Sequence, residues 1–192
     1  RQMFLRYSIT LGPLDTRAYA PITLTEQAQT SWGDVSITSI AGAIRDAATA
    51  GDTGLNIIAD ELRLLAARGI GVIGTSSNAI ETQVRVLTAQ VTASGAINID
   101  ESTGLMLGTV ASISVNRIGA DASVTTLAGT ASQSGLIGVA ATDLILQVRS
   151  GDLLVDGNLS TLTTGNILLG VFGAINVAGL ITAESDAITL HA

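Results

Sequence analysis

Pairs of carboxylates are the first candidates for a catalytic site in this chain. Two carboxyl groups on one face can act as general acid and general base in the cleavage of a polysaccharide. The candidate pairs are Asp60 with Glu61, Asp100 with Glu101, and Asp152 with Asp156. Adjacent side chains of a strand point to opposite faces, so the first two pairs should not converge. The third pair flanks the apolar segment 153–155, which is typical of turn residues. We therefore expect no catalytic residue and no enzymatic activity.

A calcium site is the second chemical possibility. Asp152, Asp156 and Asn158 offer oxygen ligands within seven residues, and oxygen is the ligand that Ca²⁺ prefers. The Gly-Gly-x-Gly-x-Asp nonapeptide of calcium-binding β-rolls is absent. Ordinary turn chemistry is the favoured interpretation of these three residues, so we predict no metal and no cofactor while leaving calcium at this position open.

Other catalytic arrangements are missing from the sequence. His191 is the single histidine and lies next to the last residue, so it could join a Ser–His–Asp arrangement only if the terminus folded back onto a site. No Gly-x-Ser-x-Gly, P-loop or His-Glu-x-x-His spacing occurs. Cysteine is absent, which excludes disulfides and thiolate metal sites.

Charge and composition restrict the class of protein. The net charge of −7 argues against a nucleic-acid partner.

Hydrophobic residues make up 47% of the chain but aromatic residues only 3%, so the core must consist mainly of Ala, Ile, Leu and Val. No stretch reaches the roughly 18 apolar residues of a membrane helix, and we expect no membrane span. Thin, repeated layers of aliphatic side chains suit this composition better than a core built around large rings.

Short apolar segments cut by turn residues are the main structural signal, and they are clearest from residue 140 to the end. Leu144–Val148, Leu153–Val155 and Ile188–Leu190 are separated by Gly, Asp and Asn. Strands this short cannot bury an apolar side alone, whereas strands stacked on one another can. The pattern predicts an all-β fold, a parallel β-helix or β-solenoid.

Repeated Gly-containing units support this fold. Gly42-Ala43-Ile44, Gly95-Ala96-Ile97 and Gly173-Ala174-Ile175 resemble one another, and the spacing is 27 residues from Gly42 to Gly69, 26 from Gly69 to Gly95 and 22 from Gly151 to Gly173. These spacings fall within the window of repeat architectures. Asn98 and Asn176 occupy the same place in their units, which predicts an asparagine ladder or a turn rather than a ligand contact.

Residues 55–69 have two interpretations. Good helix formers followed by Gly69 would suit a helix with a glycine cap. The same residues also suit two short strands, Leu55–Ile58 and Leu62–Ala66, separated by Ala59-Asp60-Glu61. We favour the strands, because the solenoid pattern continues directly after Gly69. The preceding segment 46–54 is expected to be a loop.

Residues 1–31 differ from the remainder, residues 32–192, in which we find no linker and no second domain. They hold both prolines, both tyrosines and a third of the arginines. Strands are expected at Phe4–Leu11 and Pro21–Thr25. A solenoid needs a covered end, so this segment is expected to be a cap, with a strand-donating arm as the alternative.

The apolar repeats in 62–71 and 144–153 resemble those of filamentous haemagglutinin-type proteins, large bacterial surface adhesins, over roughly residues 32–192. The Asn-Pro secretion signature of that family is missing. The resemblance implies an exported, right-handed parallel β-helix with a structural or adhesive role. We therefore expect an extracellular or cell-surface protein that is a rod or filament-forming subunit or a fragment of a giant surface protein. It is expected to self-associate into filaments, end to end or by strand addition, and to have a cell-surface or glycan ligand. A carbohydrate-active β-helix enzyme is the alternative. An ice-binding solenoid is a weaker third hypothesis, since Thr-x-Thr repeats are sporadic.

Overall fold

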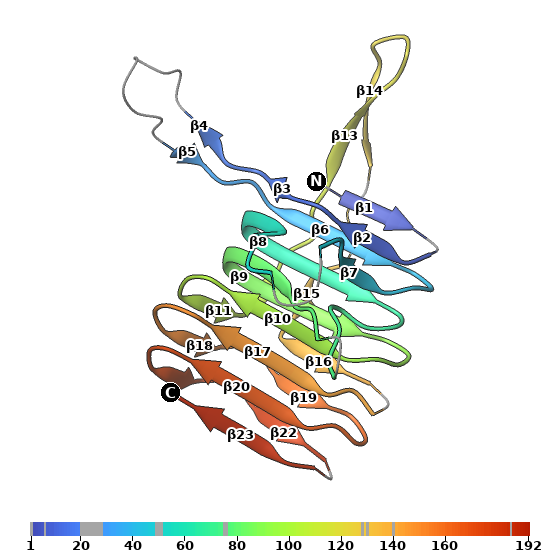
Figure 1. Ribbon diagram of the computed structural model, residues 1–192. Coiled ribbons are helices and arrows are strands. Elements are labelled where there is room, and N and C mark those ends of the chain that lie inside the picture. The colour runs from blue at the N-terminus through green and yellow to red at the C-terminus, as the bar shows by residue number, and fades with distance from the viewer. Residues whose placement is uncertain are drawn as a thin grey trace.

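The computed structural model describes residues 2–5, 7–19, 29–48, 52–74, 77–127, 129, 131–139, 141–184 and 186–192. Within these ranges the chain forms strands and no helix, which confirms the all-β prediction. Most strands belong to one large parallel sheet that is curled into a half-barrel (Figure 1). In the same ranges, no helix long and apolar enough to cross a membrane is found.

The longest path through the sheet runs from one end of the molecule to the other. Each strand on it pairs in parallel with the strand from the next pass of the chain. In spatial order these strands are β1 (Gln2–Leu5), β6 (Val35–Ser39), β8 (Ile57–Ala66), β9 (Ile80–Val91), β10 (Ile97–Glu101), β17 (Leu144–Val148), β20 (Ile167–Val171) and β23 (Ile188–His191).

Three parallel ladders lie side by side in this sheet. The first contains β10, β17, β20 and β23. The second contains β11 (Leu105–Leu107), β18 (Leu153–Val155) and β21 (Ile175–Val177). The third contains β16 (Leu136–Gly138), β19 (Leu159–Thr161) and β22 (Ile181–Ala183). The long strand β9 pairs with the first strand of all three. From β17 onward the chain visits the ladders in strict rotation.

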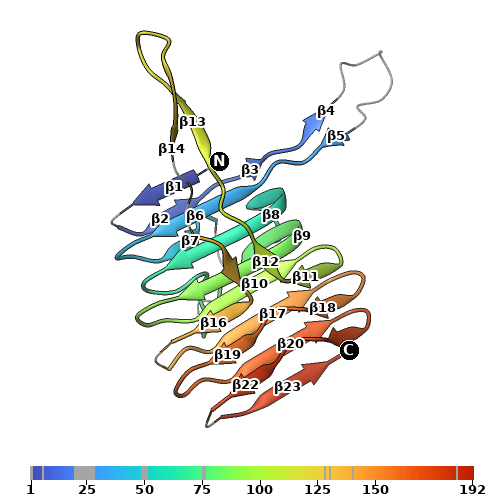
Figure 2. The same ribbon diagram turned by 180° about the vertical axis from the view of Figure 1, so that it is seen from behind.

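Shorter strands extend or leave the ladders. The parallel pairs are β2 (Ile9–Leu11) with β7 (Ile44–Asp46), and β3 (Leu14–Asp15) with β8. The antiparallel pairs are β4 (Ala18–Tyr19) with β5 (Gln29–Ser31), β12 (Thr109–Val110) with β15 (Gln133–Ser134), and β13 (Val115–Ile118) with β14 (Val124–Leu127). The β4–β5 and β13–β14 hairpins project beyond the N-terminal end of the stack in both views (Figures 1 and 2).

The core consists of aliphatic side chains stacked in register. Ile97, Leu144 and Ile167 occupy neighbouring positions in the first ladder and are fully or almost fully buried. Leu107 and Val155 repeat the arrangement in the second ladder. Each such side chain contributes about 1.5–3 kcal/mol by leaving water, so regular layers stabilise the fold without disulfides.

One segment outside the ladders was not anticipated from the sequence. Residues 109–134 leave the sheet after Gly108 and return at Gly135, so β12 to β15 form an excursion between the second and third ladders. The N–H of Gly135 donates to the carbonyl of Gly108 at 2.9 Å. Gly135 has φ +73°, and a Cβ there would overlap the backbone oxygen of Asn158 in the next pass. The corner therefore requires glycine.

Residues 55–69 form strand β8, as favoured above, but the predicted split is wrong. A single strand of ten residues runs from Ile57 to Ala66 and includes Ala59-Asp60-Glu61. Its pairing with β9 is interrupted only at Asp60, whose N–H donates instead to the carbonyl of Gly33. The polar residues therefore bend the strand at a corner rather than end it.

The Gly-containing units mark successive passes only in part. Ile44, Ile70 and Ile97 do pair in one ladder, and Leu153 pairs with Ile175. Ile175, however, lies in the second ladder, not in the first. Asn98 is opposite Ile145 in the first ladder and Asn176 is opposite Leu154 in the second. The predicted Asn98–Asn176 ladder is therefore wrong, because similar turns precede strands of different ladders.

At the N-terminal end, β1, β2 and β3 pair in parallel with β6, β7 and β8. The strand predicted at Phe4–Leu11 is divided into β1 and β2, with Tyr7 and Ser8 outside both. The strand predicted at Pro21–Thr25 lies outside the described residues. The division of the chain at residue 31, and the cap or arm role of residues 1–31, stay predictions.

Candidate functional site

The pair Asp60 and Glu61 converges, contrary to prediction. The guanidinium of Arg85 donates to both Asp60 carboxylate oxygens, at 2.7 and 2.9 Å, and to Glu61 at 3.2 Å. Successive side chains do not point to opposite faces of the strand here, because Asp60 lies where the pairing of β8 with β9 is interrupted. Arg85 lowers the pKa of Asp60, mainly through these hydrogen bonds. The single positive charge of Arg85 therefore compensates part of the negative charge of this pair.

Asp100 and Glu101 diverge, as predicted from strand alternation. Arg149 Nε donates to Asp100 Oδ1 at 2.6 Å, and a second guanidinium nitrogen contacts Oδ2. Glu101 lies fully buried on the other side of β10 and accepts hydrogen bonds from the hydroxyls of Thr82, at 2.7 Å, and of Thr103, at 2.8 Å. The backbone N–H of Val84 also donates to it, at 3.1 Å.

The carboxyl of Glu101 takes up a proton at a higher pH than an ordinary glutamate does. Burial raises the pKa of its carboxyl, and the hydrogen bonds from Thr82, Thr103 and Val84 offset only part of this effect. The resulting pKa is about 7. Because the side chain is enclosed, Glu101 has no access to a substrate, and its role is structural.

Each of the three residues of the calcium position considered above, Asp152, Asp156 and Asn158, makes a hydrogen bond to a neighbouring pass of the chain. Asp152 Oδ1 accepts the N–H of Ala174 at 2.9 Å, linking two passes of the chain. The N–H of Asp156 donates to the carbonyl of Leu107, also at 2.9 Å. The carbonyl of Asn158 accepts from the N–H of Leu136 at the same distance. Among the described residues, the metal-binding geometry of at least three acidic groups is found elsewhere.

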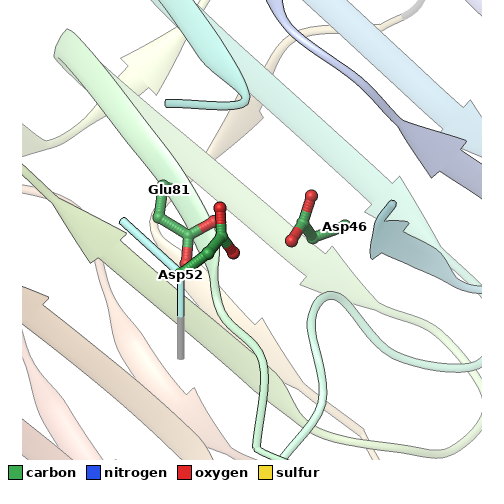
Figure 3. Close-up of side chains that lie close together, drawn as sticks. All are labelled: Asp46, Asp52 and Glu81. Carbon is green, nitrogen blue, oxygen red and sulfur yellow. The ribbon is translucent and has the colours of Figure 1, made fainter. Parts of the chain in front are cut away.

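That other group consists of Asp46, Asp52 and Glu81, here called the acidic cluster. One carboxylate oxygen from each lies within 4.8 Å of the others. Asp46 ends β7, Asp52 lies in the loop that follows, and Glu81 is the second residue of β9. Figure 3 shows Glu81 and Asp52 directed toward each other, with Asp46 beside them.

Two asparagines hold the acidic cluster in place. Asn56 Nδ2 donates to Asp46 Oδ1 at 2.6 Å, and Asn78 Nδ2 donates to Asp46 Oδ2 at 3.0 Å. The Oδ1 of Asn56 accepts the N–H of Glu81 at 2.9 Å. These hydrogen bonds therefore connect loops from two passes of the chain with the start of β9 at the acidic cluster.

Several oxygens at this point have no hydrogen-bond partner although they are buried. They are Asp52 Oδ1, Asn78 Oδ1 and Glu81 Oε2. Burial, together with the negative charges of Asp52, Asp46 and Asp100, raises the pKa of Glu81 to about 7. For Asp46, burial would raise the pKa, but hydrogen bonds from Ala48, Asn56 and Asn78 together lower it. A buried orphan oxygen is costly, so the cluster is arranged for a ligand or a proton.

A cavity of about 420 Å³ adjoins the acidic cluster on the outer side of the first ladder. Its lining includes Asp52, Glu81, Asp100, Gln147 and Arg149. It contains no aromatic residue, and Arg149 is already paired with Asp100. The side of the cavity that adjoins the acidic cluster is therefore lined by polar side chains and is accessible from solvent.

A second cavity of about 320 Å³ contains the single tryptophan. Trp32 lines it together with Asp60, Gln83 and Arg85. The guanidinium of Arg17 lies 6.0 Å from the centre of the indole ring. An indole ring beside charged and amide groups can stack on an apolar ligand face while the polar groups bind hydroxyls.

Comparisons of the chain with protein-family models, with curated proteins and with solved structures found no match. The resemblance to filamentous haemagglutinin-type proteins therefore stays a prediction.

Sequence reasoning missed the acidic cluster and placed His191 without a role. His191 is the exposed last residue of β23. The acidic cluster joins residues that are 35 positions apart in the sequence, from Asp46 to Glu81. One signal was present: the expected loop 46–54 carries two aspartates, and Ala47, Ala48 and residues 52–55 do lie outside the strands.

Proposed function

We propose that the protein is a β-helical rod subunit with a structural or adhesive role outside the cell. In this proposal the curled sheet closes into a right-handed β-helix. The three parallel ladders visited in rotation, with one continuous aliphatic core between them, support the closure. The handedness is supported by the general preference of parallel connections for right-handed crossings.

One observation carries the rod proposal: among the described residues, no further layer covers the pass from β21 to β23. Val177, Leu180, Ile188 and Leu190 are all more than two fifths exposed, whereas Ile167 and Leu169, one pass earlier, are buried. β23 ends the main path, so one of its edges has no partner strand among the described residues. An aliphatic layer with an open parallel edge is a template for one more layer.

The occupant that we propose for this end is the β1 end of a second copy. Both ends present strands that pair in parallel with their neighbours, so head-to-tail stacking adds one more layer and propagates into a filament. An extracellular location is supported by the resemblance to filamentous haemagglutinin-type proteins.

The test compares the wild-type chain with an Ile188→Lys/Leu190→Lys double variant by sedimentation velocity and negative-stain electron microscopy. Rods or concentration-dependent oligomers are expected for the wild type, and their loss is expected in the double variant, because two lysines would have to be buried. Leu154→Lys, on the exposed face of β18 and away from both ends of the stack, is the matched control and should still assemble. A wild-type chain that stays monomeric, or a double variant that assembles equally well, refutes the rod proposal.

A carbohydrate-directed function is the second candidate, and the Trp32 cavity favours it. In the adhesive form the cavity holds a glycan; in the enzymatic form it, or the neighbouring polar cavity, also cleaves one. Because Trp32 is the only tryptophan, its fluorescence reports binding directly. Titration with neutral and acidic oligosaccharides should change this signal in the wild type and not in Arg85→Met. Release of reducing ends from a polysaccharide would favour the enzyme, and a silent titration would refute both forms.

A further inference from the structure

We propose that the acidic cluster is a Ca²⁺ site, in which Asp46, Asp52 and Glu81 are the carboxylate ligands and Asn78 supplies an amide oxygen. The site differs from the calcium position considered at Asp152, Asp156 and Asn158. It is independent of the rod proposal, because it lies on the side of the first ladder and not at either end.

The spacing of the oxygens fits a calcium ion. Ca²⁺ binds oxygen ligands at about 2.3–2.6 Å, so two ligands on opposite sides of the ion lie about 4.6–5.2 Å apart. One oxygen each from Asp46, Asp52 and Glu81 lies within 4.8 Å of the others. The three carboxylates can therefore contact one ion with small side-chain adjustments.

A second, independent observation points to a ligand. Glu81 is only 5% exposed, and its Oε2 has no hydrogen-bond partner. This oxygen is on the side chain that Figure 3 shows directed toward Asp52. Asp52 Oδ1 and Asn78 Oδ1 are likewise buried and unpartnered. A cation bound in the acidic cluster would give these oxygens a partner, whereas one water molecule can donate only two hydrogen bonds.

The charge balance also favours a cation. Three carboxylates lie together, and the basic residue of the adjoining cavity, Arg149, is paired with Asp100. The donors that reach Asp46 are the side-chain amides of Asn56 and Asn78 and backbone N–H groups such as that of Ala48, and none of them carries a net charge. The amides orient the carboxylate as outer-shell partners do in metal sites.

The donor set selects the kind of ion. Every ligand atom is an oxygen, which suits Ca²⁺ or Mg²⁺ rather than Zn²⁺ or copper. Asp52 comes from a loop and Asn78 from another loop, an adaptable arrangement that suits the variable geometry of Ca²⁺ better than the strict octahedron of Mg²⁺. In this position the ion would fasten the loops after β7 and before β9 to the first ladder.

Isothermal titration of the 192-residue chain, stripped with EDTA, with CaCl₂ tests the site. We expect one saturable site with a Kd of roughly 10⁻⁶ to 10⁻³ M and weaker binding of MgCl₂. Calcium should also raise the Tm, by roughly 5 °C at about a hundred times Kd. Glu81→Gln and Asp52→Asn should each weaken calcium affinity by about tenfold or more.

Asp156→Asn is the matched control, because it neutralises an exposed aspartate of the alternative position and should bind calcium as the wild type does. Glu81→Gln should be at least as stable as the wild type without calcium, since it removes a charge from a repulsive group, so loss of binding will not reflect unfolding. The proposal is overturned if the wild type binds no calcium at millimolar concentration, or if Asp156→Asn abolishes binding while Glu81→Gln retains it.

Discussion

Glu101 should make the stability of this protein fall as the pH rises toward neutrality. Its carboxyl is fully buried, with a pKa of about 7 in the folded chain against an ordinary value of 4.5. Between these values the folded chain holds a proton that the unfolded chain has lost. Stability is therefore greatest below about pH 4.5 with respect to this group, and decreases until the pH passes about 7.

The magnitude follows from the two pKa values. A difference of about 2.5 units at 1.36 kcal/mol per unit corresponds to about 3 kcal/mol of unfolding free energy lost across the window. Four donor groups stabilise the ionised form in part, and their effect is already contained in that folded pKa. Such a loss is a large fraction of the roughly 5–15 kcal/mol by which most domains are stable.

The assay is urea unfolding of the wild type and of Glu101→Gln at pH 5, 6, 7 and 8, in EDTA. The amide of glutamine does not titrate, so the variant should lack the contribution of Glu101 to the pH dependence. Its stability at one pH is not diagnostic, because the amide changes the hydrogen bonds to Val84 and Thr103. Glu81 also has a raised pKa in this window and contributes equally to both proteins.

The reasoning is refuted if the unfolding free energies of the wild type and of Glu101→Gln change in parallel from pH 5 to pH 8. Equal slopes would mean that Glu101 is ionised throughout, with its hydrogen bonds outweighing burial. A steeper decrease in the wild type, by about 3 kcal/mol over the range, supports the raised pKa.

Three further predictions concern packing and the surface. Gly135→Ala should destabilise the fold by about 3 kcal/mol or more in urea unfolding, because positive φ and overlap with Asn158 both oppose a Cβ; an unchanged midpoint would contradict this. Replacing Val115–Leu127 by a short Gly-Ser linker should leave the Tm within about 2 °C, since β14 is exposed throughout. Arg85→Met should cost at most about 1 kcal/mol, because its ion pair with Asp60 is largely exposed.

The positions of many strands could be predicted from the sequence because these strands share one local pattern. Alternating aliphatic residues ended by Gly or Asp identified β17, β18 and β23 closely, and the spacing of Gly151 and Gly173 gave the offset between neighbouring passes. The same rule underestimated the length of β8, because Asp60 and Glu61 suggested that the strand is interrupted there. A polar pair can bend a strand without ending it when the backbone finds another acceptor, here the carbonyl of Gly33.

The acidic cluster and the excursion could not be predicted in the same way. Which oxygens meet depends on register between passes, and register depends on loop lengths that the apolar pattern does not encode. Asn98 and Asn176 show the difficulty, since identical local sequences start strands in different ladders. The excursion was hidden because Gly108 and Gly135, which follow β11 and precede β16 in the same pass, are adjacent in space but separated by 26 residues of other sequence.

The unbroken course of β9 through all three ladders has a consequence for how the protein acquires its shape. Nine residues of β8 pair with β9, with a break at Asp60, so this one contact spans the positions at which β9 meets all three ladders. Later passes, whose strands are three to five residues long, add one short segment at a time to that template. Amide protons of β8 and β9 should accordingly exchange with solvent last, and those of β21 to β23 first.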